Sequence, residues 1–211
     1  MGNQALFPGF AGRRGSTLVE VMMAITVLAI GATGVIALQK VAMSANRHSR
    51  SIAVANEVAR TWVERLRTDA MLWNYPSPTN PTDDFGDTMW LSGRVVEQNQ
   101  VDTAWFRPMA DGITCGIHDV FGRDGVCGSP SAVLGPYCVN LRLSWIRREH
   151  DTVRAEVRVY WVVSNQGDDA LDPKDMPCGD GEKVPDVDAL AEAGVVRVVH
   201  AVTAVTKNEA P

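Results

Sequence analysis

The strongest pattern along the chain is an uncharged apolar run near its start. Residues Val21 to Leu38 read VMMAITVLAIGATGVIAL without a charged side chain. At 1.5 Å of rise per residue this run spans about 27 Å as a helix, close to the hydrocarbon thickness of a bilayer. A backbone in lipid must satisfy its own hydrogen bonds, so the run predicts a membrane-spanning helix. Residues 1–15 contain no acidic residue and include Arg13 and Arg14, which predicts a cytoplasmic N-terminus and export of the rest.

Beyond the apolar run the helical pattern becomes amphipathic. Apolar residues recur at spacings of three and four, while charged residues occupy the other faces. No proline occurs between Ser16 and Tyr75, so one helix over 16–72 is predicted, with 16–39 in the membrane and 40–72 packed against the protein's own globular head. The apolar positions of the second part are Ile52, Ala55, Ala59, Trp62 and Leu66.

The pattern then changes from the helical period to the period of strands. Residues 82–135 are rich in Gly and Asp, with one short strand predicted at 93–97. Apolar and polar residues alternate over 137–145 and again over 153–163. With a polar turn at 148–151 between them, the two segments predict an antiparallel hairpin with one apolar face.

A last strand is predicted at 195–205, where apolar residues fall on both faces and the pairing partner stays open. A long helix followed by antiparallel strands predicts an α+β fold. The expected domains are a segment before the helix at 1–15, the helix at 16–72 and a globular head at 73–211.

The residues directly before the apolar run carry a family resemblance. Gly15-Ser16-Thr17-Leu18-Val19-Glu20 resembles the prepilin signature of type IV pilins and type II secretion pseudopilins, where Gly-Phe-Thr-Leu-Ile-Glu precedes the apolar helix. The resemblance implies that a prepilin peptidase removes 1–15 as a leader by cutting after Gly15. The same enzyme then N-methylates Ser16, which stands where the family usually has Phe. It also implies that Glu20 pairs with the N-terminal amine of a neighbouring subunit during assembly.

Residues within the apolar run resemble one particular group of this family. Val27-Leu28-Ala29-Ile30-Gly31, followed by Gly34 and Ala37-Leu38-Gln39, resembles the minor pilin group called PilV. This implies a lollipop-shaped minor pilin that has a single-pass inner-membrane anchor and a periplasmic head, and that ends at the pilus tip. The implied partners are prepilin peptidase, other minor pilins, the major pilin and a large tip adhesin. Gly31 and Gly34 favour close packing of neighbouring helices.

Other functions remain open as alternatives. The first is a minor pseudopilin of a type II secretion system, which shares the same N-terminal chemistry. The second is a periplasmic domain freed by the general signal peptidase, with a small-residue site at Ala42-Met43-Ser44. The third is a DNA-uptake pilin that uses a local basic patch. The candidates for that patch are Arg142, Arg147, Arg148, Arg154 and Arg158.

Charge argues against broad binding of nucleic acid. The sequence has 20 Lys and Arg against 25 Asp and Glu, a formal net charge of −5, whereas phosphate backbones attract positively charged surfaces. At 45% hydrophobic residues the composition is that of a folded protein. No nucleic-acid partner is therefore expected.

The four cysteines predict disulfides. Cys115, Cys127, Cys138 and Cys178 all lie in the part expected to leave the cytoplasm, where disulfides persist. Of the three possible connectivities, Cys115 with Cys127 and Cys138 with Cys178 is preferred. No Cys-x-x-Cys pair is present, which argues against a zinc site.

The remaining polar residues suggest no catalysis. The four histidines share no spacing with Cys, Ser or acidic residues that is typical of a triad, and no nucleophile-elbow or phosphate-loop motif occurs. His118 beside Asp119 is interpreted as a polar surface pair. We expect no enzyme activity, no cofactor and no resident metal. Calcium in the acidic segment 168–188 stays open as an alternative.

Overall fold

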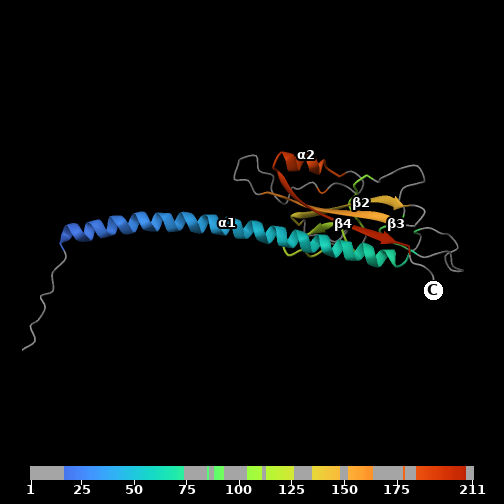
Figure 1. Cartoon of the computed structure of the whole chain (residues 1–211), viewed down its shortest axis with the longest axis horizontal. Coiled ribbons are helices and arrows are strands. Elements are labelled where there is room, and N and C mark those ends of the chain that lie inside the picture. Colours follow the sequence, from blue (N-terminus) through green and yellow to red (C-terminus); the bar gives the residue numbers. More distant parts are fainter. Residues whose placement is uncertain are drawn as a thin grey trace, which may run out of the picture. The chain divides into compact units, whose positions relative to one another are not determined.

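The computed structural model describes residues 17–73, 85, 88–92, 104–110, 113–125, 135–147, 152–163, 178 and 184–207. Its elements in chain order are α1 (Leu18–Ala70), β1 (Ile117–His118), β2 (Tyr137–Arg147), β3 (Thr152–Val162), α2 (Val187–Glu192) and β4 (Val196–Thr206), shown in Figure 1. The chain divides into two units, Met1–His48 and Ser49–Pro211, each described by itself below. The strand predicted at 93–97 and the turn at 148–151 lie outside the described residues.

The long helix is confirmed, with α1 spanning Leu18–Ala70 against a prediction of 16–72. After Ala70 the chain tightens, because the N–H groups of Met71, Leu72 and Trp73 each donate to the carbonyl three residues earlier. Helices commonly end in such tighter turns, which accounts for the small difference at this end.

The second half of α1 packs against the sheet as the amphipathic pattern predicted. Ala55, Ala59, Trp62 and Leu66 are buried in the main hydrophobic core, and Ile52 packs at its border. Val58 and Val63 widen the buried stripe to the breadth typical of a helix facing a globular core.

The sheet has four strands in the order β1-β2-β3-β4, and all three neighbouring pairs are antiparallel. The predicted hairpin is confirmed as β2 and β3, with a bulge between Trp145 and Arg147. The partner that the sequence left open for the last strand is β3, which pairs with β4 in unbroken register from Thr152↔Thr206 to Val162↔Val196.

Alternation along the strands builds two faces. The inner face, turned toward α1, carries the core side chains of both hairpin strands, Val139, Leu141, Leu143, Val153, Ala155, Val157 and Val159. The outer face buries a second, smaller cluster that includes Cys138, Tyr160 and Val196. The architecture is the predicted pilin-like α+β fold, in which a long helix packs on an antiparallel sheet.

Two short elements were not predicted. In β1 only Ile117 and His118 pair with β2, and this is too short for a periodic signal. Asp186 is the N-cap of helix α2, and its carboxylate accepts the N–H of Ala189 at 3.1 Å. Gly194 follows the C-cap Ala193, and its φ of 73° allows the left-handed turn that closes a helix.

Candidate assembly segment and the polar sites of the head

The start of α1 is capped by Thr17. Its carbonyl accepts the N–H of Val21 at 3.2 Å, and its hydroxyl accepts the N–H of Glu20 in a long contact of 3.4 Å. Thr-x-x-Glu is a known helix-start signature, so this pattern is the sequence signal that would have located the cap. The helix start therefore places the Glu20 carboxylate in the first turn, exposed to its surroundings. Gly15 and Ser16 lie outside the described residues.

No described segment of the chain covers the first half of α1. Every residue from Thr17 to Arg50 is exposed, and the large apolar side chains between Leu18 and Met43 are 46% to 79% accessible. Among the described residues this is the one helix long and apolar enough to cross a membrane. Contiguous apolar surface on this scale requires lipid or another protein as cover.

The hydroxyl groups of two threonines within the apolar run donate hydrogen bonds to backbone carbonyls of the same helix. Thr26 donates to the carbonyl of Met23 and Thr33 to that of Ile30, each at 2.8 Å. This arrangement suits an apolar environment, where no water is present to accept the bond. A side chain added at Gly31 or Gly34 would meet nothing within 4 Å, so the close helix packing predicted for these glycines requires another molecule.

The comparisons with known proteins bear on this same segment. Residues 11–36 match the model of the prokaryotic N-terminal methylation motif. Searches of curated proteins and of solved structures found no significant match. The matched residues include the predicted cleavage site, Glu20 and most of the apolar run. The match supports a type IV pilin-like prepilin that is processed by prepilin peptidase and associates with the membrane.

His118 is not the surface residue that the sequence suggested. It is 1% exposed, and its Nε2 accepts the indole N–H of Trp62 at 3.0 Å. Its Nδ1 lies 3.1 Å from the carbonyl oxygen of Gly122, so a neutral ring with its proton on Nδ1 satisfies both contacts. Burial lowers the pKa of His118, and the carboxylate of Asp124, 3.2 Å from Nε2, opposes that shift. Asp119, the expected partner, pairs with Arg123 instead.

The proposed basic patch is not an open cationic surface over the described residues. Arg142 and Arg154 both form ion pairs with Glu156. Arg158 is 2% exposed, donates to Asn140 at 3.1 Å and has its guanidinium carbon 4.2 Å from the centre of the Trp105 ring. Such pairing and stacking leave these three arginines turned to other side chains of the head. Arg148 and the Arg147 side chain lie outside the described residues.

The three described cysteines, Cys115, Cys138 and Cys178, belong to the second cluster. Cys138 and Cys178 form a disulfide with their Cα atoms 5.3 Å apart, one of the two pairs preferred from the sequence. Cys115 is also disulfide-bonded, and Cys127, its preferred partner, lies outside the described residues. The Cys138–Cys178 bridge fastens β2 to the segment before α2, where both sulfur-bearing side chains are buried.

The acidic segment considered for calcium is described only in part. Asp186 caps α2, and Asp188 lies 3.9 Å from a guanidinium nitrogen of Arg158. Most of 168–183 lies outside the described residues. No group of three His, Cys, Asp or Glu side chains that could hold a metal ion occurs in the part of the chain that the structure describes.

A buried carboxylate that the sequence did not single out organises the end of α1. Asp69 is 6% exposed and accepts the backbone N–H of Met89 at 2.7 Å, of Trp90 at 2.8 Å and of Leu91 at 3.1 Å. These bonds hold the segment at 88–92 against α1, where the Trp90 and Trp62 rings meet edge to face with centres 5.1 Å apart. Asp69 therefore holds the segment at 88–92 in the hydrophobic core of the head.

Proposed function

We propose that this chain is a minor type IV pilin, cut after Gly15 and N-methylated on Ser16. The first half of α1 anchors it in the inner membrane with the head in the periplasm. It then joins other minor pilins in a complex that primes pilus assembly and remains near the tip, in contact with the major pilin and a large tip adhesin. The observation that carries the proposal is the exposed apolar half of α1 directly behind a prepilin-type start.

Glu20 provides the chemistry of assembly in this proposal. A carboxylate carried into an apolar filament core is costly by a few kcal/mol unless it meets a partner. The amine of Ser16 in a neighbouring subunit keeps its positive charge after methylation. Pairing the two groups removes two unfavourable buried charges at once, and it fixes the axial register of adjacent subunits. The exposure of Glu20 in the first turn of α1 supports this role.

Processing is tested with Gly15→Ala. We expect this variant to keep the mass of the precursor, identical to the wild-type protein in a strain without prepilin peptidase. N-terminal sequencing of the wild-type protein should begin at Ser16. A mature chain that begins near residue 45 would instead identify an exported soluble domain and overturn the proposal.

Assembly is tested with Glu20→Ala and Glu20→Gln. Both variants should insert into the membrane normally and yet be depleted from sheared pili at least tenfold, because both remove the negative charge. The matched control is Glu64→Ala, which removes an exposed carboxylate from the other half of the same helix. Wild-type incorporation of Glu20→Ala would contradict the pairing mechanism.

Deletion of the gene distinguishes a type IV pilus subunit from a subunit of a type II secretion system. If the chain is a minor pilin, deleting its gene should abolish piliation and twitching motility and leave protein secretion normal. The opposite outcome would assign the chain to the pseudopilus of a type II secretion system, which uses the same processing.

A further inference from the structure

A tight turn after β1 presents two apolar side chains on the surface of the head. Val120 is 53% exposed and Phe121 is 63% exposed. The carboxylate of Asp119 fixes this turn, because its Oδ1 accepts the N–H of Phe121 at 2.8 Å and the N–H of Arg123 at 3.0 Å. The turn at 119–123 therefore holds both apolar side chains in place before any partner binds, which lowers the ordering cost of binding.

The 119–123 turn packs on the first residues of α1 that belong to the head. A side chain added at Gly122 would meet Val58 of α1 at 3.3 Å. Phe121 lies nearer the start of the helix, where the guanidinium carbon of Arg50 is 5.7 Å from the centre of its ring. The head unit begins one residue before Arg50. The turn therefore lies at the end of the head from which α1 continues into the apolar run.

The length of α1 between the apolar run and the head is short. Large exposed apolar side chains continue from the run to Leu38 and Met43, which precede Arg50 by twelve and seven residues. At 1.5 Å of rise per residue, Arg50 is about 11–18 Å along the helix from these residues. The headgroup layer of a bilayer is about 5–8 Å thick on each side, and charges act over about a further 8 Å at physiological salt. A bilayer spanned by the apolar run therefore comes within reach of this end of the head.

The charges of this stretch select a lipid surface as the partner. No acidic residue occurs between Glu20 and Glu57. Within that stretch the apolar run is followed by three basic residues, Lys40, Arg47 and Arg50. Basic residues close to a membrane-spanning helix are attracted to anionic phospholipid headgroups. Since the chain as a whole carries a net charge of −5, this attraction turns the basic end of the head toward the membrane.

The head itself does not cancel the positive charge of Arg50. Arg123 is ion-paired with Asp119, so these two charges balance each other. Arg50 lies near the uncharged ring of Phe121, and among the described residues no ion pair involves it. A guanidinium beside a ring still directs N–H groups outward from its edge, where they can bind a phosphate. The turn therefore combines a positive charge with two exposed apolar side chains.

We propose that Arg50, Val120 and Phe121 form a docking surface for a bilayer that contains anionic phospholipid. The Arg50 guanidinium binds lipid phosphate, and the two apolar side chains enter the headgroup layer. This inference rests on the membrane anchoring in the proposed function and not on assembly into a pilus. If the chain is a minor pilin, the subunit breaks these contacts when it leaves the membrane for the filament.

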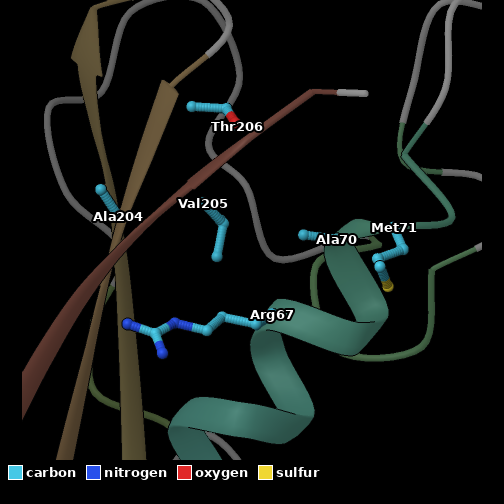
Figure 2. A pocket seen from close by; sticks show the side chains of 6 residues that line it. All are labelled: Arg67, Ala70, Met71, Ala204, Val205 and Thr206. Carbon is cyan, nitrogen blue, oxygen red and sulfur yellow. The ribbon is translucent and has the colours of Figure 1, made fainter. Parts of the chain in front are cut away.

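The test uses the full chain in vesicles of phosphatidylcholine and phosphatidylglycerol that also contain a lipid with a nitroxide on its headgroup. The environment-sensitive fluorescent amino acid Anap replaces Phe121 or, as the control, Met71. Met71 is 65% exposed and thus matches Phe121, but Figure 2 shows it at the far end of α1, about 30 Å along the helix from Arg50. Docking predicts that the nitroxide quenches the probe at position 121 at least threefold more strongly than the probe at position 71.

Two pairs of variants test the charge and the apolar contact. Arg50→Gln should reduce quenching at position 121 at least twofold, whereas Arg60→Gln, which removes an exposed positive charge farther along the same helix, should leave it unchanged. Val120→Asp should also reduce quenching at least twofold, and Val120→Leu should retain it. Replacing phosphatidylglycerol with phosphatidylcholine should act like Arg50→Gln. Because the three substituted residues are exposed, all four variants should unfold at the wild-type urea concentration.

The outcomes keep docking apart from the proposed function. Equal quenching at positions 121 and 71 would overturn the docking surface, and so would quenching at 121 that neither phosphatidylglycerol nor Arg50→Gln changes. Flotation of the same vesicles tests the anchor separately. A chain that does not float with the vesicles refutes the anchor and docking together, whereas a chain that floats without selective quenching refutes docking only. A deletion phenotype confined to protein secretion would refute the pilus role and leave docking in place.

Discussion

Replacing Asp69 with alanine should cost the head a large part of its stability. The change leaves three backbone N–H groups without the carboxylate that accepts them at 2.7–3.1 Å. Hydrogen bonds to a charged group contribute about 1.5–3 kcal/mol each, so keeping the segment at 88–92 in place would cost more than about 4 kcal/mol.

The chain has a less costly alternative, which is to release that segment. Release exposes Trp90 and Leu91, whose burial contributes about 1.5–3 kcal/mol each, and it returns backbone freedom of about 1–2 kcal/mol per residue to a few residues. Since the protein follows whichever route costs less, we expect Asp69→Ala to lower the free energy of unfolding by about 1–4 kcal/mol, less than the cost of keeping the segment in place. Asp69→Asn keeps one acceptor oxygen and should lose about 1–3 kcal/mol.

The assay is urea unfolding of the full chain in mild detergent, followed by tryptophan fluorescence. Trp62 and Trp90 lie in contact, so the signal reports on this part of the core. Glu64→Ala is the matched control, because it removes an exposed carboxylate of the same helix and should change stability by less than about 0.5 kcal/mol. If Asp69→Ala unfolds at the same urea concentration as Glu64→Ala, the argument from the three N–H groups is wrong.

Three further predictions use the same unfolding assay. Cys138→Ala with Cys178→Ala opens a loop with a sequence separation of 40 and should cost about 4 kcal/mol; a loss below 1 kcal/mol would contradict the closure argument. Because burial lowers the pKa of His118, folding disfavours its protonation; stability should therefore fall below pH 6.5 by at most about 1.4 kcal/mol per pH unit, and an unchanged slope in His118→Gln would refute this. Gly116→Ala should cost over 2 kcal/mol and Gly194→Ala about 1 kcal/mol. Both glycines have positive φ, but only the Cβ at Gly116 meets a backbone oxygen, Pro108 O, at 2.8 Å; equal losses would contradict the prediction.

Features set by neighbours in the sequence were predicted well. The apolar run and the amphipathic stripe give α1, because a helix of period 3.6 brings residues three and four apart onto one face. The β2–β3 hairpin follows from alternation and a short connection, which leave few alternatives for pairing. The N-terminal motif is equally local, so its match over residues 11–36 agrees with what the residues themselves indicated.

Polar residues of the head were predicted poorly, because their roles depend on segments far away in the sequence. His118 was assigned to its neighbour Asp119, yet its ring is bonded to Trp62, 56 residues earlier. Arg158 is one candidate for a local basic patch in the sequence, yet its guanidinium lies over the Trp105 ring. Charge and polarity along a sequence indicate that a side chain needs partners or water, but they do not identify which.

The sequence alone determined that this protein has an apolar helix behind a prepilin-type start, an amphipathic continuation and a hairpin with one apolar face. These follow from steric and hydrophobic rules that act within a few residues. Only the tertiary structure decided that Asp69 holds the segment at 88–92, that β3 takes β4 as its second neighbour and that the far edge of β4 stays open among the described residues. Such choices depend on which backbone groups meet once the core has formed, and hydrogen bonds between distant segments leave no periodic pattern in the sequence.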